Sequence, residues 1–254
     1  MIMNLKKLLR SCLPRTSKAH RILSGQLRGS RIVTSWHDYP AAIIGYAEKE
    51  LTAWLLQQVQ PGETWLDVGA HYGYTSISMC ERTESRGRVF AFEPSLSSAA
   101  CLARTRLANR HWWWTICPFG LDQSPALTGH ELPWVRGMID SQVAPSAADG
   151  TERFLSVALA SVWPGLSAGD QKVHGIKMDV QGMEIEALNG MRELLRAFRP
   201  KLVLEIHAGV DRTKVVEILR AVGYNTQPES IEKGATDFFD PQSNFSFAFN
   251  AVTD

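Results

Sequence analysis

The chain has 254 residues, of which 44% are hydrophobic and 21% are charged, and its formal net charge is +1. This size suits one α/β domain with an extension, or at most two small domains, and the composition is ordinary for a soluble globular protein. No window approaches 18 uninterrupted apolar residues, so we expect no membrane-spanning helix.

Residues 1–45 are predicted to form a basic extension ahead of a main domain at 46–254. Eight basic residues precede the first acid, Asp38, which leaves a net charge of −7 on the remainder. This asymmetry favours contact with something anionic, and residues 1–31 are the candidate for peripheral contact with an anionic surface. The simpler interpretation is a short amphipathic helix that packs on the domain; an organellar transit peptide is a further alternative.

Helix and strand patterns then alternate along the chain. Apolar spacing predicts a helix over 46–59, and Pro61-Gly62 ends it. Strands are expected at 64–69, at 88–94, within 111–121, at 173–180 and at 201–207. Helices are expected over 73–83 and along three apolar stripes, which begin at Leu96, Leu188 and Val215. The first of these stripes continues through Ala100, Ala103 and Leu107 as the apolar face of its helix.

Three other segments carry weaker patterns. Residues 122–150 are rich in Ser, Ala, Pro, Gly and Asp and are interpreted as a long excursion that includes a hairpin. The triplet Trp112-Trp113-Trp114 invites base or sugar stacking, but its place in a strand favours at least one buried ring. Residues 223–227 and 244–250 are predicted to pair as an antiparallel hairpin at one edge of a sheet.

Strands that alternate with helices predict a parallel sheet that is covered on both faces. The strands are near-continuous apolar runs, which is typical of strands buried on both faces. In such sheets ligands bind beyond the carboxyl ends of the strands. The four cysteines, which include no CxxC pair, are expected to be reduced thiols of a cytoplasmic protein.

The segment WLDVGAHYGYTS (65–76) follows the first predicted strand and has the form D-x-G-x-x-x-G. A dinucleotide fingerprint requires two glycines that are two positions apart, whereas Gly69 and Gly73 are four apart and enclose the bulky His71. The carboxylate of Asp67 would repel a pyrophosphate and attract an ammonium group. This turn therefore favours a cofactor with a cationic amino-acid part.

Glu93 ends the second predicted strand, 20 residues after Gly73. A carboxylate at this position can accept hydrogen bonds from both hydroxyls of a ribose. A cofactor with a free ribose at one end and an amino group at the other fits both signals, and S-adenosylmethionine satisfies this description.

Three blocks of the chain resemble the FkbM family of class I S-adenosylmethionine-dependent methyltransferases. They are WLDVGAHYG (65–73) with FAFEP (90–94), IKMDVQGMEIEALNGM (176–191) and RPKLVLEIH (199–207), and IIGYAEKEL (43–51) resembles a segment that precedes the fold in some members. The resemblance implies a Rossmann-like class I methyltransferase fold with a seven-stranded, mostly parallel sheet and an antiparallel edge strand. It also implies methylation of a hydroxyl group on a small molecule or a glycan, without a nucleic-acid partner.

Residues of two kinds are expected at the site. Those expected to bind the cofactor are Asp67, Gly69, Ala70, His71, Gly73, Glu93 and Asp122, where Asp122 follows the third strand and could reach the adenine amino group. The candidate catalytic residues are Asp179, as a base or acceptor-orienting group, with Glu205 and His207, which end the fifth strand near the same mouth.

Lys177 shares a strand face with Asp179 and must be paired if it is buried. Asp67 and Glu205 are both within reach, and a Lys177–Glu205 pair is the structural interpretation. No metal is expected, because Asp179 with Gln181, which stands where the family usually has Glu, is a poor cage for a divalent cation.

The chain departs from the family pattern at three places. The family often has Asn where His71 stands, usually has Glu where Gln181 stands, and has a Leu-Asp pair where this chain reads Leu159-Ala160-Ser161. Two other functions therefore stay open: a nicotinamide-dependent oxidoreductase on a similar sheet, and a non-catalytic cofactor-binding protein whose basic N-terminus holds an anionic partner.

Overall fold

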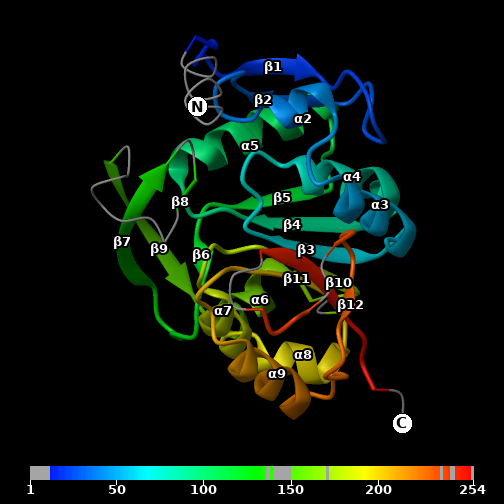
Figure 1. Ribbon diagram of the computed structural model, residues 1–254, viewed down its shortest axis with the longest axis vertical. Coiled ribbons are helices and arrows are strands. Elements are labelled where there is room, and N and C mark those ends of the chain that lie inside the picture. Colours follow the sequence, from blue (N-terminus) through cyan, green and yellow to red (C-terminus); the bar gives the residue numbers. More distant parts are fainter. Residues whose placement is uncertain are drawn as a thin grey trace.

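The computed structural model describes residues 12–135, 138–139, 150–169, 172–234, 237–240 and 244–252. Its central sheet contains β3 (Thr64–Val68), β4 (Arg88–Phe92), β5 (Trp114–Cys117), β10 (Gly175–Met178), β11 (Lys201–Ile206), β12 (Glu229–Ser230) and β13 (Phe245–Phe249). The seven strands lie in the order β12-β13-β11-β10-β3-β4-β5 (Figure 1). From β11 to β5 all neighbours are parallel, and β13 runs antiparallel to both β11 and β12.

Helices cover both faces of this sheet (Figure 1). One face holds α3 (Lys49–Gln58), α4 (Tyr74–Thr83) and α5 (Leu96–Asn109), and the other holds α6 (Leu159–Leu166), α7 (Glu184–Asn189), α8 (Arg192–Phe198) and α9 (Arg212–Ala221). Successive side chains of a strand point to opposite faces, so Trp65 joins the apolar cluster on one side and Leu66 the cluster on the other. The predicted α/β class and mostly parallel sheet are confirmed.

The described part of the N-terminal segment packs into the same core. It forms β1 (Lys18–Arg21), β2 (Arg31–Thr34) and α2 (Pro40–Ile44). Ile32 and Ile43 are buried in one cluster with Leu55 and Trp65, so a boundary between residues 45 and 46 crosses a continuous apolar core. The amphipathic helix predicted for the extreme N-terminus lies largely outside the described residues.

Helix α5 buries a different face from the one predicted. Leu96 and Leu107 are 63% and 54% exposed, whereas Cys101, Leu102 and Thr105 are buried. The reason is that α5 packs between the sheet and β2, where the Thr105 hydroxyl accepts a hydrogen bond of 2.9 Å from the backbone N–H of Val33. A small polar side chain with a partner suits this contact better than the leucine stripe does.

The C-terminal edge of the sheet also differs from the prediction. Residues 223–227 form no strand, and Tyr224 makes only an isolated bridge to Ala251. Tyr224 is instead a core residue whose hydroxyl donates to the Pro200 carbonyl. The edge strand is β12, which pairs with β13.

A second sheet stands beside the central one (Figure 1). It contains β6 (Gly120–Leu121), β7 (Thr128–Val135), β8 (Met138–Ile139) and β9 (Gly150–Val157), in the order β6-β9-β7-β8. The antiparallel pairing of β7 with β8 lies within the excursion, where a hairpin was predicted, whereas β9 begins at the last residue of the excursion and also pairs with β7. Residues 136–137 and 140–149 of the excursion lie outside the described residues.

The tryptophan triplet is divided between the core and the surface. Trp114 is fully buried in β5, whereas Trp112 is 60% exposed, so the core interpretation of the triplet is confirmed for Trp114.

All four cysteines are free thiols. In the part of the chain that the structure describes, no helix combines the length and the apolar character that crossing a membrane requires.

Gly175 of β10 lies directly opposite Trp65 of β3. A Cβ atom at Gly175 would lie 2.4 Å from three atoms of the Trp65 ring, which is fully buried and cannot move aside. We expect Gly175→Ala to lower the free energy of unfolding by about 1–3 kcal/mol through overpacking, as measured by urea denaturation. The matched control is Gly129→Ala in β7, where no heavy atom lies within 4 Å of the added Cβ. Equal effects of the two substitutions would contradict this explanation.

Candidate active site

A cavity of about 440 Å³ opens at the carboxyl ends of the central strands, where parallel sheets bind ligands. The turn after β3, the ends of β4 and β10, and the second sheet form most of its wall. Residues 38–41 of the N-terminal segment, with Tyr46 and Glu48, complete the wall. The cavity therefore lies among segments that are far apart in the chain.

The backbone of the turn after β3 lies close to the backbone that follows β10, as the glycine in this turn predicts. Gly69 has a φ of 79°, and a Cβ there would lie 1.7 Å from the Asp179 carbonyl oxygen. Only glycine fits this position without strain or collision. The N–H groups of Gly69 and Ala70 both donate to the Phe92 carbonyl at the end of β4. Gly69, Ala70 and His71, the predicted cofactor-binding residues of this turn, all lie on the cavity wall.

His71 shapes the wall with both its backbone and its ring. Its φ of 48° is left-handed, which directs its N–H toward Glu93 Oε2 at 2.7 Å. Its ring lies against Tyr72, with 3.8 Å between the ring centroids, and near Tyr39. The backbone of His71 therefore holds Glu93 in place, while its ring packs near Tyr72 and Tyr39 at the cavity.

Gly73 has a packing role in place of the predicted cofactor contact. It is the N-cap of α4, with a φ of 90°, and a Cβ there would lie 2.6 Å from side-chain atoms of both Leu102 and Trp114. Gly73 is not part of the cavity wall. The second glycine of the motif thus lets α4 begin against the core.

Glu93 lies on the cavity wall at the end of β4. Its two carboxylate oxygens accept hydrogen bonds from the backbone N–H groups of Ser95, at 2.9 Å, and His71, at 2.7 Å. Burial raises the pKa of Glu93 to about 7, although both backbone hydrogen bonds lower it. The carboxyl group therefore changes charge near neutral pH.

Asp67 lies behind the cavity wall, which corrects the prediction that it meets an ammonium group directly. Its side chain is fully buried, and its Oδ2 accepts hydrogen bonds from the hydroxyls of Thr75 and Ser76. Its Oδ1 lies 3.3 Å from Lys177 Nζ. Because side chains alternate along β3, the Asp67 carboxylate points toward α4 and not into the cavity. Lys177 lies between this carboxylate and the cavity.

Lys177 pairs with Asp67, which corrects the structural interpretation of a Lys177–Glu205 pair. Parallel register places Lys177 level with Asp67 on β3 and with Val203 on β11, so Glu205 lies further along its strand. Lys177 Nζ also donates to the Gly69 carbonyl at 2.9 Å and lies 3.9 Å from Asp179 Oδ2. Burial opposes the charge, but Asp67 and Asp179 outweigh it and raise the pKa of Lys177.

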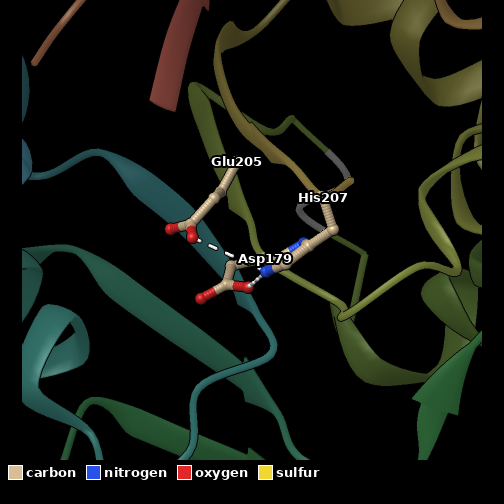
Figure 2. Close-up of side chains that lie close together, drawn as sticks. All are labelled: Asp179, Glu205 and His207. Carbon is tan, nitrogen blue, oxygen red and sulfur yellow. Dashed lines mark ion pairs between the residues drawn. The ribbon is translucent and has the colours of Figure 1, made fainter. Parts of the chain in front are cut away.

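The three predicted catalytic side chains come together (Figure 2). His207 Nε2 lies 3.5 Å from Asp179 Oδ1 and 3.6 Å from Glu205 Oε1. On the other side of its ring, His207 Nδ1 lies 2.8 Å from Oε1 of the fully buried Glu184. Burial and the nearby Asp179 carboxylate raise the pKa of Glu205 well above its ordinary value. Asp179 itself lies on the cavity wall.

Asp122 lies apart from the cavity wall. Its carboxylate accepts hydrogen bonds from the Ser124 N–H at 2.7 Å and from the Ser156 hydroxyl, and His130 Nε2 lies 3.3 Å away. These partners belong to the second sheet and the loop leading to it, which the strand prediction did not include. Asp122 is therefore held by the start of the second sheet, and its contact with an adenine amino group stays a prediction.

Tyr39 and Glu48 are among the cavity-wall residues that were not predicted. Tyr39 donates a hydrogen bond from its hydroxyl to Glu48 Oε1, and both side chains line the cavity. Glu48 has a left-handed φ of 42° at the N-cap of α3. Burial raises the pKa of Glu48, whereas the Lys177 charge lowers it. Glu48 lies in the segment at 43–51, which resembles a family motif. That resemblance assigned no function to Glu48.

Comparisons with known proteins agree with this arrangement. A family model for the methyltransferase FkbM domain matches residues 67–226. The hexuronic acid methyltransferase AglP of Haloferax volcanii is 28% identical over 190 residues, which cover 71% of each chain.

Solved structures are similar to this fold. The FkbM methyltransferase of Methylobacillus flagellatus KT has a TM-score of 0.50 and 16% identity, and the match covers 78% of this chain and 50% of that one. An rRNA methylase of Streptococcus thermophilus has a TM-score of 0.50 and 8% identity, and the match covers 84% of this chain and 100% of that one. This chain thus spans about half the length of the Methylobacillus structure, and both likenesses concern the fold alone.

Removal of one partner of the buried Lys177–Asp67 pair should strongly destabilise the fold. We expect Lys177→Met to lower the free energy of unfolding by about 3–5 kcal/mol, because it leaves the Asp67 carboxylate buried without a cation. Urea denaturation at pH 7 measures the change. The control is Arg153→Met, which removes an ion pair with Glu131 whose partners are 87% and 47% exposed and should have a much smaller effect. Similar effects of the two substitutions would refute a special role for Lys177.

Proposed function

Because the chain belongs to the FkbM methyltransferase family, we propose that it transfers the methyl group of S-adenosylmethionine to a hydroxyl group of a sugar-like acceptor. The observation that carries this proposal is one cavity whose wall includes Glu93, the Gly69 turn and Asp179. His207 and Glu205 lie beside Asp179, which makes two groups of residues. The first group suits a cofactor and the second suits an acceptor hydroxyl.

The cofactor end is formed by the turn at 69–71 and by Glu93. A cavity of about 440 Å³ lies within the usual range for cofactor pockets. In its ionised form Glu93 can accept hydrogen bonds from two ribose hydroxyls, while the Gly69 turn lets the backbone approach a ligand closely. When bound, S-adenosylmethionine supplies an electrophilic methyl group on a positively charged sulfur atom.

The acceptor end is formed by Asp179. Methyl transfer to a hydroxyl requires the oxygen to be held in line and its proton to be removed. Asp179 lies on the wall, and its Oδ1 accepts a hydrogen bond of 3.0 Å from Gln181 Nε2. We assign proton removal to the Asp179 carboxylate, whereas Glu205 and His207 position it from the adjacent strand.

The class of acceptor is supported by the relative AglP, whose name gives hexuronic acid as its substrate. The polar side chains of Tyr39, Glu48 and Asp179 on the cavity wall offer hydrogen-bonding groups that suit a sugar. Family membership argues against the nicotinamide-dependent oxidoreductase, as does the four-residue spacing of Gly69 and Gly73. Gln181 bonds to Asp179 and so keeps this carboxylate oriented, which favours an enzyme over a non-catalytic binding protein.

Two other predictions about the cellular context stay as proposals. The four free thiols support a cytoplasmic location. The exposed side chains of Lys18, Arg21 and Arg31 on the β1–β2 hairpin support contact with an anionic surface through the predicted basic extension.

Cofactor affinity should depend on pH through Glu93. Its pKa of about 7 leaves roughly a tenth of the carboxyl groups ionised at pH 6 and roughly nine tenths at pH 8. We therefore expect S-adenosylhomocysteine to bind about tenfold more weakly at pH 6 than at pH 8, as measured by calorimetry. Glu93→Gln should weaken binding and remove this pH dependence; an unchanged pH profile in the variant would refute the assignment. Calorimetry with NAD should give no binding.

Asp179 should matter for turnover and not for cofactor binding. We expect Asp179→Asn to lower kcat by about 10²–10⁴ through loss of the proton acceptor, as measured by mass spectrometry of methylated hexuronic acids and glycans. The dissociation constant for S-adenosylhomocysteine should stay within about threefold of the wild-type value, because Glu93 and the Gly69 turn are untouched. A methylation rate equal to that of the wild type would remove Asp179 from the mechanism.

A further inference from the structure

Asp179, Glu205 and His207 present three potential metal ligands at one point (Figure 2). One ligand atom from each residue lies within 4.8 Å of the other two. They come from the carboxyl ends of the neighbouring parallel strands β10 and β11. Two ligands that share one ion at about 2.1–2.2 Å are roughly 3.0–3.6 Å apart, and the His207 Nε2 distances of 3.5 and 3.6 Å fall in this range.

Glu184 fixes the orientation of the His207 ring. Its Oε1 lies 2.8 Å from His207 Nδ1, and both side chains are at least nine-tenths buried. When Nδ1–H donates to Glu184, a neutral ring directs the lone pair of Nε2 toward Asp179 and Glu205. A lone pair that faces two carboxylates is repelled unless a metal ion or a proton lies between them. The same carboxylate–histidine arrangement is typical of metal-binding histidines.

The charges around the cavity also favour a bound cation. Glu48, Glu93 and Asp179 contribute acids to its wall, whereas Lys177 is the sole Lys or Arg among the described residues that line it. The ammonium group of Lys177 already faces Asp67 at 3.3 Å. Little positive charge is therefore left for the Asp179–Glu205 side of the cavity, and a uronic acid acceptor would add a further carboxylate there.

We propose that Asp179 Oδ1, Glu205 Oε1 and His207 Nε2 bind a divalent metal ion, with Glu184 as the outer residue that orients His207. Two carboxylate oxygens and one imidazole nitrogen suit a divalent first-row transition metal, of which Mn²⁺ is the probe used below, whereas Mg²⁺ prefers oxygen ligands alone. This inference revises the expectation of no metal, which counted only Asp179 and Gln181. It rests on the proposed methyl-transfer site, of which it forms the acceptor end.

The metal ion would extend the role of Asp179. Positions that the protein leaves open on the ion would face the cavity, where an acceptor hydroxyl or a sugar carboxylate can bind. Coordination lowers the pKa of a bound hydroxyl. Asp179 Oδ2, which lies 3.9 Å from Lys177 Nζ, stays available to take the proton while Oδ1 binds the ion.

The test is an electron paramagnetic resonance titration of Mn²⁺ into the full chain after treatment with a chelator. It uses neither cofactor nor acceptor, so its result is separate from that of S-adenosylhomocysteine calorimetry, which tests the proposed function. We expect one saturable site per chain with a dissociation constant below about 100 µM. Glu205→Gln and His207→Gln should each weaken Mn²⁺ binding at least tenfold, and Glu184→Gln should weaken it about 10–100-fold.

The matched control is Glu186→Gln, which changes a carboxylate on the same helix as Glu184 but outside the cluster and should leave Mn²⁺ binding unchanged. Circular dichroism melts verify that each variant is folded, and the wild-type titration is decisive even where a variant is not. Absence of saturable Mn²⁺ binding to the wild type would overturn the proposal, because the cation in the cluster would then be a protonated His207. Binding that persists in both folded ligand variants would overturn it as well.

Discussion

A buried lysine links the parts of this molecule that meet at the cavity. Lys177 Nζ donates to the Gly69 carbonyl, lies 3.3 Å from Asp67 and faces Asp179. One ammonium group thus joins β3, the turn that follows it and the end of β10. Because a buried charge without a partner is costly, any slip of these strands past one another would separate it from the acids. The positions of the Gly69 turn and of Asp179 both depend on this contact.

The parallel sheet brings two groups of residues to the cavity. β3 and β4 deliver the turn and Glu93, whereas β10 and β11 deliver Asp179, Glu205 and His207. Each group stands where its strand ends, so the spacing between strands sets the spacing between the residues proposed to bind the cofactor and those proposed to meet the acceptor.

Local patterns predicted the parts that depend on local geometry. The Gly69 turn and the position of Glu93 follow from a strand, a glycine and an acid close together in the chain. Which face a side chain takes was harder to predict: Asp67 points behind the wall, and α5 exposes Leu96 because its buried side contacts β2. The spacing of residues along the chain does not predict which side chains on neighbouring strands are in contact. The Glu184–His207 bond and the partners of Lys177 require the register of β10 with its neighbours.

The wall formed by Tyr39 and Glu48 has a consequence for how such proteins diversify. These residues precede the matched family region, which starts at residue 67, yet they face the same cavity as Glu93 and Asp179. Under the proposed function, selection can change the recognised acceptor by changing this leading segment, while the residues proposed to hold the methyl donor stay as they are. Substrate range and reaction chemistry can evolve on separate stretches of one gene.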